Sequence, residues 1–360
     1  MLLKKKYKIL IKNGNNKMKR TKNMIRNFII FILLIILTFY IILKDQNISE
    51  ILDIALSVKK EFIIIAILCM CFYIACEAIN IGRTLKALNE KSTFLKNVKY
   101  ALIGFFFSSI TPAASGGQPM QIYYMYKDKI SVANSTLTLL INLSCMQVVT
   151  ISIALVSLFF NYQYLNTTLI WLFVIGVSLN LTALTLLLIL IFSKRMTKGI
   201  INITIKIIKF FRVKNIEDKQ IKLEAELNKY QGSATYIKNN KLLILKTLST
   251  TYIQFIAYYS ISYFVYRSFG LSEHNIFEII TMQSILFATV SGIPSPGAVG
   301  VSEGEFLAIF RHVYSENMVN SAMLLSRGIN FYLFVLISLI VAMISMMKDK
   351  KQELKIENKR

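Results

Sequence analysis

The stretch Ser291–Phe306, "SGIPSPGAVGVSEGEF", places two prolines and four glycines between the apolar stretches 276–290 and 307–310. Proline lacks a backbone N–H and clashes with the preceding helical turn, and glycine weakens a helix interior, so one continuous helix cannot pass through it. Backbone polar groups released from a helix at membrane depth must be buried in protein or line a wet cavity. The stretch therefore predicts half-helices that meet at a polar site within a membrane.

A second break, "TPAASGGQP" at Thr111–Pro119, follows the apolar stretch 98–111. All four prolines of the chain and six of its fourteen glycines lie in these two segments. The apolar segments elsewhere contain few helix breakers. The concentration of proline and glycine in two places therefore indicates that the breaks have a structural or functional role. We expect two broken helical hairpins; the alternative is that both breaks are packed kinks without a ligand.

The composition is that of a membrane protein, since 55% of the 360 residues are hydrophobic. A spanning helix needs about 20 mostly apolar residues. The predicted fold is an all-α polytopic membrane protein with about six full spans and two Pro/Gly-broken helical hairpins. The six spans are expected at 27–43, 62–81, 133–160, 168–192, 242–266 and 328–347.

The net charge of +23 is distributed between the apolar segments. Lysine and arginine mark cytoplasmic loops of multi-pass proteins, which favours a topological role for this charge over direct binding of nucleic acid. We therefore expect both termini in the cytoplasm. The basic segments are 1–26, 82–100, 193–241 and 348–360.

This orientation requires each broken hairpin to leave and return on the same side of the membrane. Residues 27–160 and 161–347 then each contain two spans, a broken hairpin and a third span, inserted in opposite senses. Inverted repeats with discontinuous helices are a recurring transporter architecture. The second repeat would include the cytoplasmic basic loop 193–241, and residues 1–26 and 348–360 would be cytoplasmic tails.

The broken segments supply the candidate site. Their half-helix N-termini suit an anion such as a lipid phosphate, and their glycines permit close approach of a ligand. The backbone candidates are Gly116, Gly117, Pro119, Pro294, Pro296, Gly297 and Gly300. The side-chain candidates are Glu77, Gln118, Gln121, Glu303 and Arg327.

Intramembrane ionisable residues are functional or paired by default, and two readings of Glu303 and Arg327 stay open. The two side chains either contact a ligand or form a buried structural ion pair. Four other intramembrane amides are expected to hydrogen-bond between helices. These amides are Asn142, Gln147, Gln254 and Gln283.

No metal site or cofactor is expected. The four cysteines lie in apolar segments without a CxxC pair, and the two histidines are far apart in the chain. The sequence also contains no hydrolase triad pattern, Walker loop or dinucleotide fingerprint.

At the two breaks the sequence resembles the membrane domain of bacterial lysylphosphatidylglycerol synthases/flippases, over about residues 27–347. One element is G-G-x-P at Gly116, Gly117 and Pro119, and the other is P-x-P-G-x-x-G-x-x-E from Pro294 to Glu303. An R-x4-Y feature follows, with Arg327 and Tyr332, and this adds Tyr332 to the candidate site.

The resemblance implies a multi-pass protein of the bacterial plasma membrane that binds and translocates an anionic or aminoacylated phospholipid. Full-length members join such a domain to a soluble synthase that transfers lysine from lysyl-tRNA to phosphatidylglycerol, and the product confers resistance to cationic antimicrobial peptides. This chain is expected to correspond to the translocating domain without the synthase domain.

Two alternative functions remain. The protein could act as a phosphatidylglycerol lysyltransferase together with a separately encoded synthase protein, or as a non-transporting membrane scaffold. The sequence leaves open whether it is an enzyme, and an oligomer is compatible with it.

Overall fold

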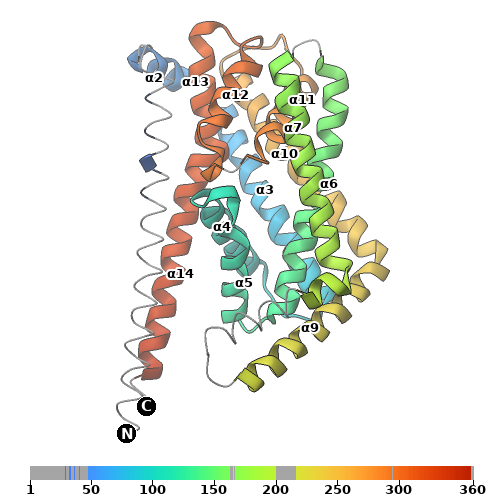
Figure 1. The fold of residues 1–360 in the computed structure, drawn as a ribbon. Helices are drawn as coiled ribbons and strands as arrows, with labels where there is room; N and C mark the ends of the chain where they lie inside the picture. The colour runs from blue at the N-terminus through green and yellow to red at the C-terminus, as the bar shows by residue number, and fades with distance from the viewer. Residues whose placement is uncertain are drawn as a thin grey trace.

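The computed structural model describes residues 48–162, 165, 167–199, 216–293 and 295–357, together with residues 29, 32, 33, 36 and 40. The predicted tail 1–26, most of the predicted span 27–43, the middle of the loop 193–241 and Pro294 lie outside the described residues. The described part of the chain is helical, with short turns between helices (Figure 1).

The first half of the fold contains six described helices. They are α2 (Ile48–Ser57), α3 (Lys60–Ala87), α4 (Phe94–Ser109), α5 (Gly117–Lys127), α6 (Val132–Asn161) and α7 (Thr167–Phe192). The second half contains α9 (Ile216–Asn239), α10 (Lys241–Ser268), α11 (Ile276–Val290), α12 (Val301–Phe310), α13 (Glu316–Arg327) and α14 (Leu333–Glu357). Three short turns complete it: the 3-10 turns η1 (Pro112–Ala114) and η3 (Pro296–Ala298), and the π-helical turn η4 (Gly328–Tyr332).

Four helices in the described ranges are long and apolar enough to cross a membrane: Lys60–Ala87, Val132–Asn161, Thr167–Phe192 and Glu316–Lys348. They contain the predicted spans 62–81, 133–160, 168–192 and 328–347, so the all-helical, multi-pass membrane fold is confirmed. The last helical run begins twelve residues before its predicted start, at Glu316.

The predicted span 242–266 is helix α10, which is 28 residues long but less apolar than the other four. Its buried face carries Thr247, Thr251, Gln254 and Ser262, and α10 packs along α3 and α11 inside the bundle. The opposite face of α10 is exposed and carries Leu245, Ile253 and Ile256, so these buried polar residues lie on the side that packs against other helices. The count of six full spans stays a prediction.

Both predicted breaks are present. The first hairpin runs from α4 through η1 to α5, and the second runs from α11 through η3 to α12. At each turn the backbone enters the left-handed region, with φ of 52° at Ala113 and 61° at Gly297. The two turns contact each other, and Figure 1 shows the α4–α5 hairpin in the lower half of the bundle and the α11–α12 hairpin in the upper half.

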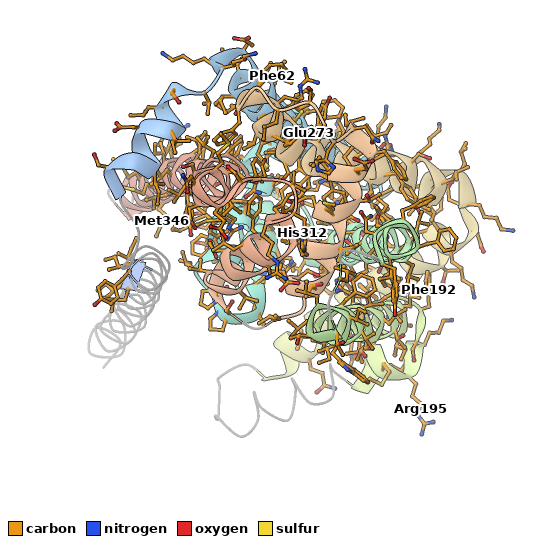
Figure 2. The ribbon with its side chains drawn as sticks, turned by 90° about the horizontal axis from the view of Figure 1, so that it is seen from above. Phe62, Phe192, Arg195, Glu273, His312 and Met346 are labelled. Carbon is orange, nitrogen blue, oxygen red and sulfur yellow. The ribbon has the colours of Figure 1, made fainter. Side chains whose placement is uncertain are left out.

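Large side chains fill the interior of the bundle, and apolar side chains also cover much of its outer surface, as a lipid environment requires. Large side chains such as Tyr100, Phe255 and Phe306 are fully buried between the helices. Helix α7 instead presents Trp171 and Ile175 on the outside, where the apolar surface suits lipid. Beyond α7 the chain turns basic, and Figure 2 shows Arg195 extending outward at the periphery.

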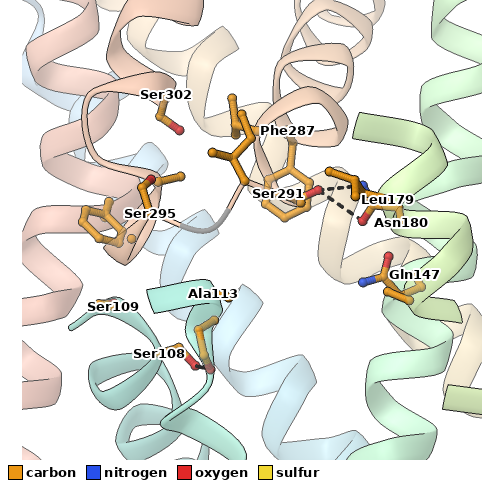
Figure 3. Close-up of a pocket in the computed structure, with 18 of the residues that line it drawn as sticks. Ser108, Ser109, Ala113, Gln147, Leu179, Asn180, Phe287, Ser291, Ser295 and Ser302 are labelled. Atoms are coloured by element: carbon orange, nitrogen blue, oxygen red, sulfur yellow. Dashed lines mark hydrogen bonds between the residues drawn. The ribbon is translucent and has the colours of Figure 1, made fainter. Parts of the chain in front are cut away.

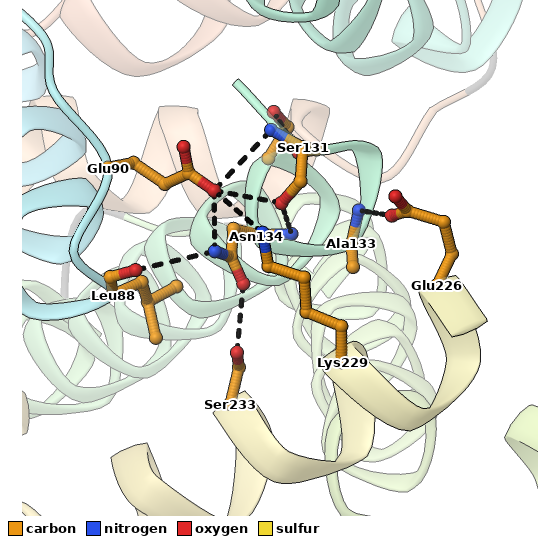
Figure 4. A network of polar contacts seen from close by, with 9 residues as sticks. Leu88, Glu90, Ser131, Ala133, Asn134, Glu226, Lys229 and Ser233 are labelled. Atoms are coloured by element: carbon orange, nitrogen blue, oxygen red, sulfur yellow. Dashed lines mark hydrogen bonds and ion pairs between the residues drawn. The ribbon is translucent and has the colours of Figure 1, made fainter. Parts of the chain in front are cut away.

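Helix α9 is joined to the start of α6 by a polar network (Figure 4). Glu90 Oε1 accepts hydrogen bonds from Ser131 Oγ at 2.9 Å, from Asn134 Nδ2 at 2.7 Å and from Lys229 Nζ at 3.1 Å. Ser233 Oγ of α9 donates to Asn134 Oδ1 at 2.8 Å. Residues 216–239 of the loop 193–241 are therefore a helix fixed to the bundle, and the cytoplasmic position of the loop stays a prediction.

Candidate functional site

A cavity of about 670 Å³ lies between the tips of the two broken hairpins and helices α6 and α7 (Figure 3). Both breaks contribute to it, as do helices that are distant in sequence. The polar residues of its lining include Ser108, Ser109 and Gln118 from the first hairpin, Ser291, Ser295 and Ser302 from the second, and Gln147, Asn180 and Asn330 from other elements. The two breaks thus border one shared cavity, whose mostly apolar lining carries a set of polar side chains.

Arg327 borders this cavity and is paired with Glu303. Arg327 Nε donates to Glu303 Oε1 at 2.8 Å, and Tyr332 OH donates to the same oxygen at 2.7 Å. The other oxygen, Oε2, accepts from the backbone N–H of Gly300 at 2.8 Å. The Glu303 side chain is 0% exposed, so its carboxylate is occupied by protein donors on both oxygens.

The second break positions this cluster. Glu303 lies in the first turn of α12 and reaches back to the N–H of Gly300, which caps the helix N-terminus with a negative charge. The carbonyl oxygen of Gly297 accepts from Arg327 Nη2 at 3.2 Å. Without the break, neither the free carbonyl of Gly297 nor the free N–H of Gly300 would exist.

The π-helical turn after α13 completes the cluster. It widens the helix at Gly328–Tyr332, where one turn supplies two aromatic neighbours for Arg327. The Arg327 guanidinium lies 4.4 Å from the centroid of Phe331 and 5.7 Å from that of Tyr332. The faces of these two rings attract the guanidinium through cation–π interactions and help to orient it.

The described residues that line the cavity carry a positive charge and no negative charge. Arg327 is the single charged residue among the described lining residues, while Glu303 lies behind it and does not line the cavity. The described residues provide acceptors for Arg327 Nε and Nη2 and none for Nη1. The ion pair therefore presents its positive end, with unused donors, to whatever occupies the cavity.

Glu77 and Gln121 form a separate contact outside the cavity lining. Gln121 Nε2 donates to the carbonyl oxygen of Tyr100 at 3.1 Å and to Glu77 Oε1 at 3.5 Å. The Gln121 side chain is buried between α3, α4 and α5. The structure thus brings these two predicted residues together, but not with Arg327.

The glycines and prolines predicted for the site do not all lie at the cavity. Gly297 lines the cavity directly, whereas Gly116 and Gly117 permit close packing of α5 on α4. A Cβ at Gly117 would lie 2.0 Å from Ser108 Oγ, so this position requires glycine. Pro119 lies in the first turn of α5 and Pro296 begins η3, both positions that need no backbone N–H.

Sequence reasoning missed part of the lining. Asn180 donates to the carbonyl oxygen of Ala288 at 3.2 Å and to Ser291 Oγ at 3.0 Å, which joins α7 to the second break. The sequence could have indicated this role, because Asn180 is the single amide side chain in the apolar helix α7. Asn330 also lines the cavity; it lies three residues after Arg327, and no sequence pattern distinguished it.

The expectation of interhelical hydrogen bonds for four amides needs correction. Gln283 Oε1 accepts from Ser262 Oγ at 2.7 Å, as expected. Among the described residues, Gln147 Oε1, both amide atoms of Asn142, and Gln254 Nε2 are buried without a hydrogen-bond partner. Gln147 lines the cavity instead, because its helix faces the space that the two breaks leave open.

The long apolar helices that surround this cavity define a multi-pass, membrane-embedded protein. Residues 26–338 match the family described as "Lysylphosphatidylglycerol synthase TM region", and the chain belongs to this family. The resemblance seen at the two breaks is thereby confirmed. No curated protein matches the chain.

Proposed function

We propose that this protein binds a phospholipid in the cavity between its two broken hairpins and moves it from one leaflet of the bacterial plasma membrane to the other. The observation that carries the proposal is the composition of the cavity, whose lining combines one guanidinium, a set of polar side chains and a row of leucines from α7. A phospholipid has the same division into a charged headgroup and apolar chains.

The part of the cavity beside Arg327 would receive the phosphate. Arg327 contributes the unused N–H donors of its guanidinium, and Glu303 and Tyr332 fix its orientation from behind. Charge-assisted hydrogen bonds from arginine to phosphate are among the strongest that proteins make. Gly297 and Ser295 at the second break add backbone and hydroxyl groups beside it.

The apolar wall would receive the acyl chains. Leu179, Leu186, Leu187 and Leu190 of α7 all line the cavity. Eleven residues separate the first from the last, which corresponds to about 16 Å along the helix axis. Leu179 and Leu186 are also exposed, so acyl chains could contact this wall.

Translocation would use the repeated arrangement of the fold. The order of helix, broken hairpin and helix occurs twice, as α3, α4–α5 and α6, and again as α10, α11–α12 and α13–α14. We propose that residues 27–160 and 161–347 are inverted repeats with both chain termini in the cytoplasm. Movement of one repeat against the other would expose the cavity to each leaflet in turn.

The test is lipid translocation in proteoliposomes with headgroup-labelled phosphatidylglycerol and an impermeant quencher. The variant Arg327→Gln/Glu303→Gln removes both charges and leaves no buried charge unpaired. We expect it to lower protein-dependent translocation by about tenfold or more, as expected for loss of a charged hydrogen bond.

The matched control is Arg267→Gln, which removes an arginine at the end of α10 that contacts Phe62 and does not line the cavity. It should translocate lipid at the unaltered rate. Equal rates for the double variant and the unaltered protein would contradict the proposed site, and no protein-dependent movement of phospholipid would contradict the proposed function.

A further inference from the structure

We infer that the cavity selects phospholipids with an uncharged, hydroxylated headgroup and discriminates against cationic headgroups such as an aminoacyl group. The inference rests on the proposed function and concerns the substrate of the same cavity. It follows from the charge of the lining, from the positions of the nearby acids and from the unpartnered polar atoms in the lining.

The charge of the lining opposes a cationic headgroup. Arg327 is the one charged side chain among the described residues that line the cavity. An ammonium group entering beside the phosphate would lose its water and would face a guanidinium without a carboxylate to pair with. A buried charge without a partner is strongly disfavoured, whereas a buried hydroxyl group needs one hydrogen bond.

The acids of the neighbouring helices do not compensate for this. Both oxygens of Glu303 are occupied by Arg327, Tyr332 and Gly300, and the side chain is fully buried. Glu77 contacts Gln121 outside the lining. Glu305 is buried on α12 and also does not line the cavity. A cationic headgroup would therefore find no available carboxylate on the described walls.

The unpartnered polar atoms match hydroxyl groups. Ser295 Oγ, Asn330 Oδ1 and Gln147 Oε1 are buried and have no hydrogen-bond partner in the described parts of the chain, and all three residues line the cavity. Two of these atoms are neutral acceptors that call for a donor hydrogen. A hydroxyl group supplies one and can also accept, so a glycerol or sugar headgroup would satisfy these atoms without adding charge.

Selectivity follows from these contacts. The guanidinium would hold the phosphate, and the hydroxyls of the headgroup would reach the serines and amides around it. Five serines line the cavity, namely Ser108, Ser109, Ser291, Ser295 and Ser302. Phosphatidylglycerol fits this description, while its lysyl ester adds two ammonium groups for which the described lining has no counter-charge.

The test compares headgroups in one assay. Proteoliposomes containing the full chain are supplied with acyl-labelled phosphatidylglycerol or lysylphosphatidylglycerol, and the protein-dependent translocation rates are measured separately. We expect phosphatidylglycerol to move at least about tenfold faster, because the ammonium groups of the lysyl lipid would enter the cavity without a counter-charge.

Designed acids in the lining should change this ratio. Gln147→Glu places a carboxylate in the cavity, and Asn330→Asp does so from another helix, in case the first variant does not fold. Either should increase the relative rate of the lysyl lipid several-fold. Asn142→Asp, on α6 with Gln147 but outside the lining, is the matched control and should leave the ratio unchanged.

The outcomes are distinguishable. Equal or faster movement of the lysyl lipid would overturn this inference and leave the proposed function standing. Movement of neither lipid would overturn the proposed function and the inference with it. An unchanged ratio in Gln147→Glu and Asn330→Asp, or the same change in Asn142→Asp, would overturn the assignment of selectivity to the cavity lining.

Discussion

At the scale of single residues, Gly297 shows why the second break tolerates little change. Its φ is 61°, and a Cβ there would lie 2.2 Å from the Phe331 ring. The same ring stacks on Arg327, and the carbonyl of Gly297 accepts from that arginine. One glycine therefore sets both the backbone turn and the environment of the guanidinium.

We expect Gly297→Ala to lower the free energy of unfolding by about 1–3 kcal/mol, because the side chain meets both a strained φ and a filled space. Thermal unfolding of the detergent-solubilised protein measures this. The control is Gly304→Ala, on α12, where a Cβ would have no neighbour within 4 Å. That variant should be neutral or slightly stabilising, and equal losses in both variants would contradict the assignment.

A second residue-scale prediction concerns the Arg327–Glu303 pair. Removing either partner alone leaves a buried charge uncompensated, and we expect Arg327→Gln or Glu303→Gln to destabilise by roughly 3–5 kcal/mol. The double variant should lose less than either single variant, since no charge is left unpaired. Unfolding midpoints of the three variants test this, and additive losses would show that the two side chains are not coupled.

At the scale of elements, the helices owe their positions to polar contacts at their ends as well as to apolar packing. The Glu90 network fixes α9 to α6 (Figure 4). Burial opposes ionisation of Glu90, but hydrogen bonds from Ser131, Asn134 and Lys229 outweigh it and hold the pKa of this carboxyl below its ordinary value of 4.5. The docked arrangement therefore favours the ionised carboxylate.

The sign of the pH dependence follows. The contribution of Glu90 to docking of α9 is fully present above pH 4.5 and is lost as the pH falls through the lowered pKa. Hydrogen exchange of α9 should therefore be slow near pH 7 and faster, after correction for intrinsic rates, at about pH 3.5.

Glu90→Gln should remove most of this pH dependence, while Glu61→Gln, at the exposed start of α3, should keep it. If α9 in the Glu90→Gln variant retained the full pH dependence, a different group would have to control the docking.

At the scale of the whole molecule, the two hairpin tips meet between halves of the chain that are far apart in sequence. The turns η1 and η3 contact each other, and η3 also contacts α4. If the cavity opens alternately to each leaflet, this contact must separate during transport.

We expect a short cross-link between η1 and η3 to stop lipid translocation. Ala114→Cys and Ala298→Cys, in a background without the four native cysteines, can be joined by a short bis-maleimide. Translocation should fall to the empty-vesicle level after cross-linking and remain normal in each single-cysteine variant. Unchanged transport in the cross-linked protein would show that the tips do not need to separate.

The sequence by itself determined the membrane class, four of the spans, both breaks and the family. These features depend on local chemistry: apolar length sets a span, and proline or glycine ends a helix wherever the fold places it. The pairing of Glu303 with Arg327 was also foreseen as one of two readings, since isolated charges in a membrane need partners.

Only the tertiary structure decided which polar residues share the cavity. Asn180 meets Ser291 across 111 positions of sequence. Gln147, expected to bond between helices, lines the cavity, and its oxygen has no partner among the residues that the structure describes. Glu77 was expected at the headgroup and lies with Gln121 instead. Helical periodicity tells which residues share a face of one helix, but the face that borders the cavity depends on how distant helices pack, and no local pattern encodes that.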